Sequence, residues 1–442
     1  MNPLKPLGFA RRTLAGALVF VFLTASGLAF SQPANRDAGT HPADVITSWL
    51  NLQLRIVRTT PAPPPFTVRR FGYTAVALYE ALAPGMAGYQ SIAPQLNGLA
   101  GLPAVTPGAR YHWPACANAA LAAMNRYLYP MTSPANKAAV DSLEAANTAQ
   151  YAGNRPADEL SRSVDFGRKI AAAVFGWAEA DGSNNNETYA LPVGEGLYEL
   201  TPPRFVPAAL PYWGKCRPML MGSLEGADRD APIPFSKDPS SAYFAQAKEV
   251  FDLSQHLTPD QKAIALFWAD DPDGKSFGGG HWMAILNQIL TARKPALDAA
   301  AIAFARLGIA TAEAGVCIFK GKYKYNGMRP VTYIRTVMKQ PDWSPLIVTP
   351  PHPEYPSGHA LISGSAAQTL ALLFGENYAF TDTSYNWLGL GPRSYRSFQE
   401  AAQEAGDSRV YGGIHYRHSC DVSLKSGKII ARNVAEKLKF RP

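Results

Sequence analysis

The stretch PSGHALISGSAAQTLALLFG, residues 356–375, changes from a turn to a helix at Gly358. Apolar residues then recur at helical spacing, and Gly375 is a typical C-terminal stop. The pattern predicts a helix over residues 358–374. The first amides and the dipole of such a helix attract anions. The stretch therefore predicts a packed helix with an anion site at its N-terminal end, beside Ser357.

The rest of the chain repeats this apolar period of about 3.6 residues. A capping box from Thr258 to Gln261, with Pro259 in the first turn, predicts one further helix start. Few segments alternate polar and apolar residues, so the predicted class is all-α: helical bundles with long connections rich in the 37 Pro and 36 Gly. The other predicted helices cover residues 43–59, 66–82, 113–128, 135–150, 157–180, 240–253, 281–291, 295–319 and 415–438.

Composition divides the chain into three segments. Residues 1–31 have a basic start and then an apolar run, which is the layout of a secretory signal peptide. A retained membrane anchor is the alternative, because the run is just long enough to span a bilayer. Helical periodicity disappears between residues 181 and 242, which separates an N-terminal helical half (32–239) from a C-terminal helical half (240–442). We expect an exported protein, periplasmic or extracellular.

A set of residues in the C-terminal third stands out when taken together: Lys322, Arg329-Pro330, Pro356-Ser357-Gly358-His359, Arg409 and His415. Singly, each has an ordinary explanation as a surface charge, a turn or a packed histidine. Together they describe a site for a tetrahedral oxyanion, because Arg offers forked donors, Lys offers a point charge, and a glycine amide can approach an oxygen closely. Two histidines on different predicted helices would flank the ion, one bonding the central atom and the other moving a proton.

This ordered set resembles the shared motif of vanadium-dependent haloperoxidases and type 2 phosphatidic acid phosphatases. The likeness is specific from about Leu200 to the C-terminus and looser before it. It implies an enzyme with the helical fold of that superfamily. Five further segments resemble bacterial, exported haloperoxidase-like proteins: Thr201-Pro202-Pro203-Arg204-Phe205, Phe267-Trp268-Ala269-Asp270, Gly280-His281-Trp282, Tyr323-Lys324-Tyr325-Asn326 and Gly412-Gly413-Ile414-His415-Tyr416.

The resemblance implies a role for each motif residue. His415 would be the ligand to vanadium, and His359 would be the acid-base group beside the apical oxygen. The implied cofactor is vanadate, whose site phosphate can also occupy, and no haem is needed. Hydrogen peroxide and halide would react to give hypohalous acid, with small organic molecules as acceptors. The residues implied to hydrogen-bond the vanadate oxygens are Lys322, which would also polarise the peroxide, Arg329, Ser357, Gly358 and Arg409.

Two alternatives stay open. A soluble exported acid phosphatase would use the same residues, with His415 attacking phosphorus to form a phosphohistidine. Such a histidine is normally oriented by a carboxylate four residues on, where this chain has Ser419, so the orientation of His415 is unexplained in either case. A non-catalytic oxyanion-binding protein is the third hypothesis.

Four other residues are assigned on weaker grounds. In the resembled family, a histidine near the position of His352 accompanies bromide or iodide activity rather than chloride activity. Phe319 and His281 are placed with it in the halide or substrate pocket, and a cap or packing role is the alternative for His281. Glu313, nine positions before Lys322, is expected on a solvated helix face rather than behind the cations.

Charge and cysteine content narrow the partners. Leader removal lowers the net charge from +8 to +5, and no Lys/Arg block survives that would indicate nucleic-acid binding. Charged residues interrupt the later apolar runs, so no membrane span is expected after the leader. Four cysteines, at positions 116, 216, 317 and 420, permit up to two disulfides, and their spacing does not choose among the pairings. We expect no bridge between Cys317 and Cys420. The oligomeric state is left open.

Overall fold

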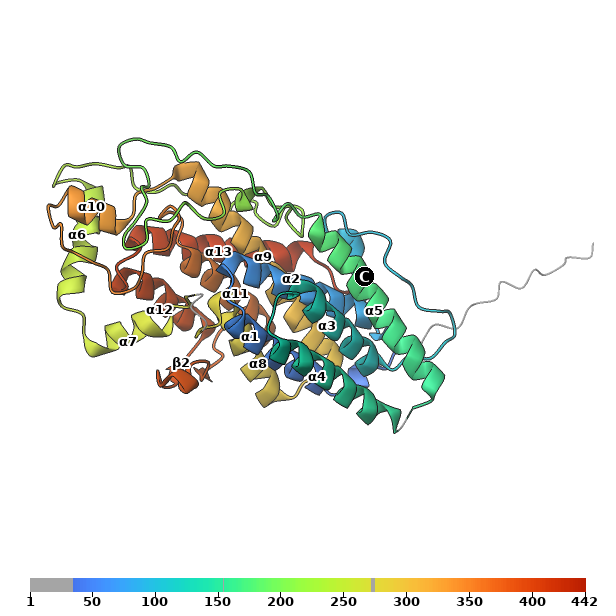
Figure 1. Cartoon of the computed structure of the whole chain (residues 1–442). Coiled ribbons are helices and arrows are strands. Elements are labelled where there is room, and N and C mark those ends of the chain that lie inside the picture. Colours follow the sequence, from blue (N-terminus) through green and yellow to red (C-terminus); the bar gives the residue numbers. More distant parts are fainter. Residues whose placement is uncertain (1–34, 154, 272–274) are drawn as a thin grey trace, which may run out of the picture. The chain divides into compact units, whose positions relative to one another are not determined.

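The computed structural model of the chain describes residues 35–153, 155–271 and 275–442, which all belong to one compact unit. The signal peptide predicted over residues 1–31 lies outside the described residues. The helices are α1 (Asp44–Thr59), α2 (Pro64–Leu82), α3 (Trp113–Leu128), α4 (Pro134–Ala152), α5 (Ala157–Glu179), α6 (Ala242–Gln255), α7 (Pro259–Phe267), α8 (His281–Arg293), α9 (Leu297–Tyr325), α10 (Pro330–Thr336), α11 (Gly358–Phe374), α12 (Phe398–Tyr411) and α13 (Arg417–Lys437) (Figure 1).

The predicted all-α class is confirmed, with four differences in detail. The short α10 and the whole of α12 were not expected; α12 buries mostly small residues, so its apolar stripe is faint in the sequence. Strands β1 (Phe380–Asp382) and β2 (Arg393–Tyr395) form a short antiparallel pair. The helix predicted from residue 415 begins two residues later, because Tyr416 is its extended N-cap, and His415 therefore lies in the preceding turn.

Local signals place several helix starts where the sequence predicts them. The Thr258 side chain accepts a hydrogen bond from the Gln261 amide, and the Gln261 side chain accepts one from the Thr258 amide, so the predicted capping box is present. Proline occupies the first turn of α2, α4, α7 and α10. A proline is tolerated there because the first amides of a helix have no partner within it.

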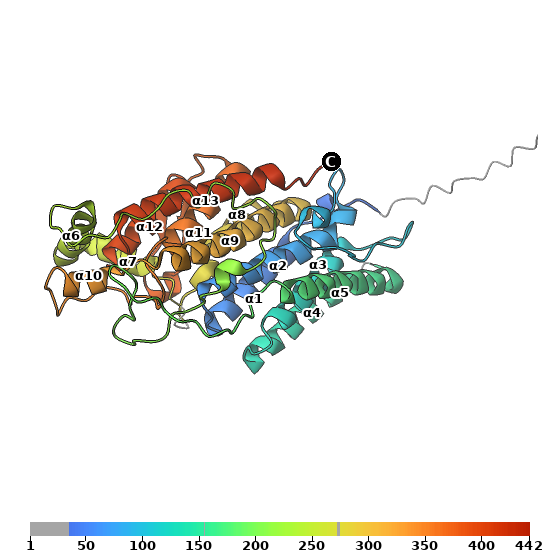
Figure 2. The same cartoon turned by 90° about the horizontal axis from the view of Figure 1, so that it is seen from above.

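Helices α2 and α9 form the centre of the fold and lie side by side in both views (Figures 1 and 2). By length and composition α9 could cross a membrane, yet 89% of its apolar window is buried inside the structure, as in the core helix of a packed bundle. Because α2 belongs to the predicted N-terminal half and α9 to the C-terminal half, the two halves share one core. The division at residue 240 stays a prediction.

Helix α11 packs on α9, α12 and α13. It is buried on all sides from Ser363 to Ala371, where apolar and small residues predominate. The crossing with α13 is close: a Cβ at Gly364 would lie 2.3 Å from the Leu424 carbonyl oxygen, and one at Gly427 would lie 2.2 Å from that of Leu361. Backbone contact at this crossing fixes the distance between the two helices that follow the PSGH turn and His415.

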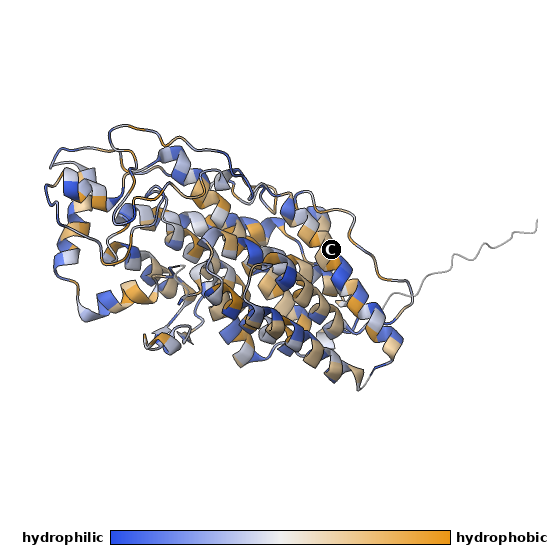
Figure 3. Ribbon diagram, in the orientation of Figure 1, coloured by the Kyte–Doolittle hydropathy of each residue, from blue (hydrophilic) through white to orange (hydrophobic). Residues whose placement is uncertain are grey.

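The outer helices are amphipathic. Helix α5 buries residues at helical spacing, among them Leu160, Ile170 and Val174, and packs them on α3 and α2. Its solvated face carries charged residues, and Figure 3 shows hydrophilic and hydrophobic residues alternating along it. This pattern is typical of a helix that covers one side of a core.

The long connection between α5 and α6 is an ordered part of the structure. Its start is fixed by the buried Asp181, which accepts hydrogen bonds from Arg69 and Tyr73 of α2. Further along, the carboxylate of Glu313 on α9 accepts hydrogen bonds from the Met219 amide and the Ser223 hydroxyl. The solvated position expected for Glu313 is therefore wrong, because its side chain is fully buried and holds this connection on α9.

Candidate active site

A cavity of about 500 Å³ lies beside the N-terminal end of α11. The motif was expected to form a pocket within the C-terminal half, but the walls also include Pro63–Pro65 at the start of α2 and Thr201–Arg204 of the connection. Most of the lining is apolar. The polar and charged side chains in it are those of Thr201, Arg204, Asp270, Asp271, His281, Lys322, Thr349, His352, His359, Ser363 and His415.

Lys322 reaches the site from the last turn of α9. Its ammonium group donates to the carbonyl oxygens of Pro353 and Pro356, both at 2.8 Å, and of Glu354 at 3.1 Å. These three bonds match the three donors of a lysine and fix the turn that leads into α11. Burial, followed by the charge of Arg329, lowers the pKa of Lys322 well below its ordinary value. Lys322 therefore supports the turn, and bonding an anion would require it to exchange one carbonyl.

Arg329 is the N-cap of α10 and is fully buried. Its guanidinium donates to the carbonyl oxygens of His352 and Ile414, and it meets the His352 Nδ1 at 2.9 Å and the His415 Nε2 at 3.3 Å. Because arginine only donates, both of these ring nitrogens must carry a lone pair. Burial lowers the pKa of Arg329 to about 10, so it remains charged at neutral pH.

His415 is oriented by Glu354, which the sequence did not single out. The His415 Nδ1 lies 2.7 Å from one carboxylate oxygen of Glu354, and the Ser419 hydroxyl donates to the other oxygen at 2.8 Å. With its lone pair on Nε2, His415 carries its proton on Nδ1 and donates it to Glu354. Burial lowers the pKa of His415 well below its usual range, which keeps the ring neutral. The lone pair on His415 Nε2 is therefore available to bond an electrophilic centre.

Ser357 and Gly358 begin α11. The Ser357 amide donates to the Ser423 hydroxyl at 2.9 Å. The Ser357 hydroxyl is buried beside the Cys420 thiol and has no hydrogen-bond partner within the described part of the chain. A Cβ at Gly358 would have no contact closer than the 3.8 Å to Ile318, so this glycine leaves open space in front of the first amides of the helix. An unsatisfied hydroxyl and free helix amides here fit an anion.

Arg409 and His359 are the remaining motif residues, and the charge of Arg409 acts on the His359 ring. Arg409, on α12, is buried and donates to the Trp268 carbonyl and the Ser408 hydroxyl. His359 on α11 lines the cavity, and its Nε2 lies 4.0 Å from a carboxylate oxygen of Asp270. Burial and the charge of Arg409 lower the pKa of His359 to about 3. In the absence of a ligand, His359 is therefore neutral at physiological pH.

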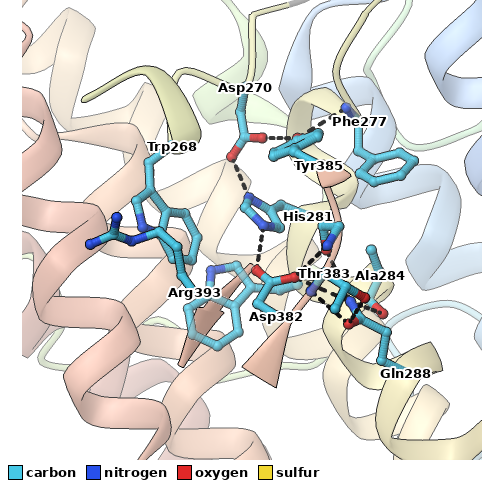
Figure 4. A network of polar contacts seen from close by, with 12 residues as sticks. Trp268, Asp270, Phe277, His281, Ala284, Gln288, Asp382, Thr383, Tyr385 and Arg393 are labelled. Atoms are coloured by element: carbon cyan, nitrogen blue, oxygen red, sulfur yellow. Dashed lines mark hydrogen bonds and ion pairs between the residues drawn. The ribbon is translucent and has the colours of Figure 1, made fainter. Parts of the chain in front are cut away.

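All three proposed pocket residues line the cavity, and two of them are in ring contact. His352 and Phe319 line the cavity with their rings 5.5 Å apart in an edge-on arrangement. His281 borders the cavity but is almost completely buried, and its two ring nitrogens lie between Asp270 and Asp382 (Figure 4). His281 therefore also belongs to a buried ionic cluster, and its pocket role stays a prediction.

The carboxylates were missed because they contact the motif only through the tertiary fold. Glu354 lies five residues before His359, where a short turn reads as ordinary loop, and Asp382 lies on a strand that had no clear pattern. Asp270 was noted only within a segment of family likeness. A short, regular spacing between acid and histidine would have been a sequence signal. The actual separations, from 11 to 101 positions, have no regular spacing.

The residues present fit a tetrahedral oxyanion. The buried side chains of Lys322, Arg329 and Arg409 supply positive charge, and the free hydroxyl and amides at the start of α11 supply donors. His415 offers a lone pair on Nε2, which suits a bond to a central metal or phosphorus atom. All four cysteines lie in the described part of the chain, and each is a buried free thiol.

Comparisons with known proteins agree with this geometry. Residues 302–441 match the family described as VCPO second helical-bundle domain. The chain is similar to the solved structure of a bacterial vanadium-dependent iodoperoxidase, with 30% sequence identity and a TM-score of 0.83, covering 91% of this chain and 97% of that one. It is also similar in fold to a bacterial vanadium-dependent chloroperoxidase in its holo and apo forms, with 18% identity, a TM-score of 0.64, and 92% and 96% of the two chains covered. No curated protein matches the chain.

Proposed function

The chain belongs to the vanadium-dependent haloperoxidase family, and we propose that it uses vanadate and hydrogen peroxide to oxidise bromide or iodide to hypohalous acid. Family membership makes it a peroxidase-class enzyme. The proposal adds the cofactor, the halide and the residues that act.

One observation carries the proposal: a neutral His415 presents its Nε2 lone pair beside the buried guanidinium of Arg329. The bond from Nδ1 to Glu354 fixes the tautomer and the ring plane, as such partners do for metal-ligating histidines. The bond from Arg329 to Nε2 is long, at 3.3 Å, so an incoming electrophile displaces a weak contact. This combination suits a ligand to vanadium.

The remaining motif residues would surround the bound ion. Vanadate, when bound, supplies a Lewis acid that activates peroxide without changing its own oxidation state. Arg329, Arg409 and Lys322 neutralise the negative charge, and their burial strengthens this effect because water does not screen it. Ser357 and Gly358 add a hydroxyl and a backbone amide.

His359 is suited to accept and return a proton at Nε2. Its low pKa keeps it neutral before the anion binds, and bound negative charge in front of it favours the protonated ring. Asp270, 4.0 Å away, adds to that preference. His359 therefore gains a proton when the site is filled and can give it to a leaving oxygen.

The walls of the cavity indicate where the other substrates bind. His352 keeps a neutral ring, because burial and the charges of Lys322 and Arg329 lower its pKa, and it stands edge-on to Phe319. A large polarisable halide such as bromide or iodide fits this mixed surface, and the similar iodoperoxidase supports the choice. The apolar residues around the entrance suit small organic acceptors.

A phosphatase that works through a phosphohistidine is the second candidate. Glu354 supplies the carboxylate that the position of Ser419 lacks, so His415 is oriented as a nucleophile would need. The family comparison favours the peroxidase.

One reconstitution experiment separates the two. Purified protein freed of bound oxyanion is mixed with vanadate, and then peroxide-dependent oxidation of iodide, bromide and chloride is measured alongside hydrolysis of a phosphate ester. Vanadate-dependent oxidation of iodide or bromide without hydrolysis supports the proposal. Hydrolysis that vanadate inhibits, without halide oxidation, refutes it.

Two lysines of α9 give a matched control for the same assay. Lys322→Ala removes a buried cation of the site, and we expect turnover to fall by about 100-fold or more. Lys320→Ala removes an exposed lysine two residues away that pairs with Asp228, and we expect turnover like that of the parent. Equal losses in the two variants would contradict the assignment of the site.

A further inference from the structure

A buried ionic cluster stands behind His359. His281, the first residue of α8, has both ring nitrogens in contact with carboxylates: Nδ1 lies 3.0 Å from Asp270 and Nε2 lies 2.8 Å from Asp382 (Figure 4). All three side chains are 5% exposed or less. Figure 4 shows the imidazole as the single link between the two acids. Neither carboxylate belongs to the motif that holds the oxyanion.

Burial raises the pKa values of Asp270 and Asp382, but contact with His281 leaves them below their ordinary value. With both acids ionised, the contacts require His281 to be a cation. An ionised carboxylate only accepts hydrogen bonds, so each ring nitrogen must carry a proton to bond its acid. Burial on its own would lower the pKa of His281, but Asp270 and Asp382 together raise it to about 10. Phe267, Trp268 and Tyr385 surround the ring, with the Trp268 centroid 4.4 Å away, and aromatic faces favour a cation.

The remaining acceptors of the cluster are also bonded. The other oxygen of Asp270 accepts from the Tyr385 hydroxyl. The other oxygen of Asp382 accepts from the Ser384 amide at 2.8 Å and from Gln288 at 3.2 Å. Two carboxylates and one imidazolium leave one net negative charge, which is held rigidly in a dry environment. A cluster satisfied in this way specifies one arrangement of its members.

Asp270 connects the cluster to the site. The same oxygen that meets His281 lies 4.0 Å from the Nε2 of His359. The backbone of Asp270 is left-handed, with φ of 48°, and the carbonyl of the nearby Trp268 is bonded by Arg409. The position of this carboxylate is therefore set by the ionic cluster and by the bond from Arg409 to the nearby Trp268 backbone.

We propose that His281 is a positioning residue for His359: as a buried cation clamped by Asp382, it keeps Asp270 ionised and facing the imidazole of His359. The inference rests on the proposed function, in which His359 moves protons. A proton that arrives on His359 Nε2 is stabilised by a carboxylate 4.0 Å away, which is close enough for charge attraction and too far for a competing hydrogen bond. His281 itself touches no reacting atom.

The charge balance around Asp270 predicts what happens without His281. Without His281, burial raises the pKa of Asp270. In the parent, the charge of His281 is the largest of the effects that lower this pKa. Asp270 takes up a proton at a higher pH than in the parent, and His359 loses its partner as the pH falls. The charged or titratable groups facing this pair are Asp271, His281, His352, Asp382, Tyr385 and Arg409.

The test uses the full chain and three variants. His281→Gln removes the cation but leaves two buried acids. The double variant His281→Gln with Asp382→Asn keeps the net charge of the cluster, so it protects the test from a folding failure. Asp382→Asn alone leaves the His281–Asp270 pair. His112→Gln is the matched control, because His112 is buried on the N-terminal side of α3, away from the lining of the cavity.

Three quantities are measured: the pH profile of kcat, the vanadate Kd by equilibrium dialysis, and the number of protons taken up when inorganic phosphate binds, by calorimetry in two buffers. For the double variant we expect kcat to fall by about 10- to 100-fold on the acid side and to approach the parent at alkaline pH. Its vanadate Kd should stay within about threefold, since the net charge of the cluster is the same as in the parent, and its proton uptake should decrease. Asp382→Asn, which removes the clamp but keeps the His281–Asp270 pair, should lie between the parent and the double variant, and His112→Gln should follow the parent.

Two results would overturn the inference. The first is a double variant whose proton uptake, and whose kcat at acid pH, equal those of the parent. The other is a parallel loss of vanadate binding and kcat at every pH, which is the mark of a merely structural role. If the parent oxidises no halide, the proposed function fails, and the proton uptake on phosphate binding still decides whether His281 sets the protonation of His359.

Discussion

Glu354 orients His415 across 61 positions of sequence. The position four residues after His415, where a carboxylate was expected, holds Ser419, whose hydroxyl donates to Glu354 and not to the histidine. The role of the expected acid is thus divided between a carboxylate from the turn before α11 and a hydroxyl from α13. Because Lys322 donates to the backbone of the same turn, the positions of the cation and the carboxylate are fixed relative to each other.

Removal of the Glu354 charge should loosen the cofactor. In Glu354→Gln the amide offers His415 Nδ1 a weaker acceptor, and losses of this kind cost about 10- to 100-fold in metal affinity. Ser419→Ala keeps the carboxylate and should cost less. Adding Ser419→Asp to Glu354→Gln returns an acid to the neighbourhood and should recover part of the vanadate affinity measured by dialysis. An unchanged Kd in Glu354→Gln would show that His415 needs no acidic partner.

His359 and His415 should fail in different ways. His415→Ala removes the ligand to vanadium, so we expect it to lose both vanadate retention and turnover. His359→Ala removes a proton carrier, so it should still bind vanadate, more weakly, while turnover falls by about 100- to 10,000-fold. Equilibrium dialysis of vanadate against both variants is the measurement. The roles are reversed if His415→Ala retains vanadate and His359→Ala does not.

At the scale of elements, the site depends on the crossing of α11 and α13. Gly364 and Gly427 bring the two backbones together, and no side chain fits between them. Helix α11 begins with the residues that face the anion, and α13 follows His415 directly. A change in the spacing of these helices therefore moves both sides of the site.

Gly427→Ala tests this dependence. Its Cβ would lie 2.2 Å from the Leu361 carbonyl oxygen and 2.5 Å from the Ser365 nitrogen, so the helices must separate. We expect a loss of stability of about 1–3 kcal/mol or more and a weaker vanadate Kd. Gly176→Ala on α5 has open space and should stabilise by about 0.5–1 kcal/mol through helix propensity. Denaturant unfolding and dialysis measure both effects, and a Gly427→Ala protein as stable as Gly176→Ala would contradict the close crossing.

At the scale of the whole molecule, buried histidines couple folding to pH. Burial is the largest cause that lowers the pKa of His112, His352, His359 and His415 from 6.5, to about 4 for His112 and about 3 for His359. Below pH 6.5 these histidines bind protons in the unfolded chain but stay neutral in the folded chain. Their contribution to stability is therefore present above that pH and is lost as the pH falls.

His112→Gln isolates one of these contributions away from the cavity. The parent should lose more stability than this variant when the pH drops from about 6.5 to about 4, because the variant has one fewer histidine to protonate on unfolding. Thermal unfolding of both proteins across this range is the measurement, with vanadate absent so that ligand binding does not contribute. Equal slopes would show that His112 is charged in the folded protein.

Vanadate should stabilise the whole protein through its site. At about 100 times its Kd, a ligand that binds only the folded state adds about 2.7 kcal/mol to the free energy of unfolding. We expect vanadate to raise the Tm of the parent and to leave that of His415→Ala unchanged. A rise of equal size in both proteins would place the bound ion away from His415.

The helical class, most helix boundaries and the ordered cationic motif were predictable from the amino-acid sequence. These depend on local physics: apolar residues at helical spacing, caps such as Thr258 to Gln261, and a glycine at the start of α11. Helix α12 escaped prediction because small buried residues give a faint stripe, although Arg409 on it was identified by the motif. Local sequence signals therefore predict the helices and which motif residues lie on them.

The acids that contact the histidines could not be predicted from the sequence, because the folding of the chain brings them together. Glu354 meets His415, and His281 lies between Asp270 and Asp382, over separations that no periodicity predicts. A buried charge is stable only with a partner, and the partner is whatever group the packing of helices brings within reach. The apolar wall from Pro63–Pro65 likewise arises because α2 packs on α9. Burial and packing, which are properties of the folded chain, set the pKa values on which this site depends.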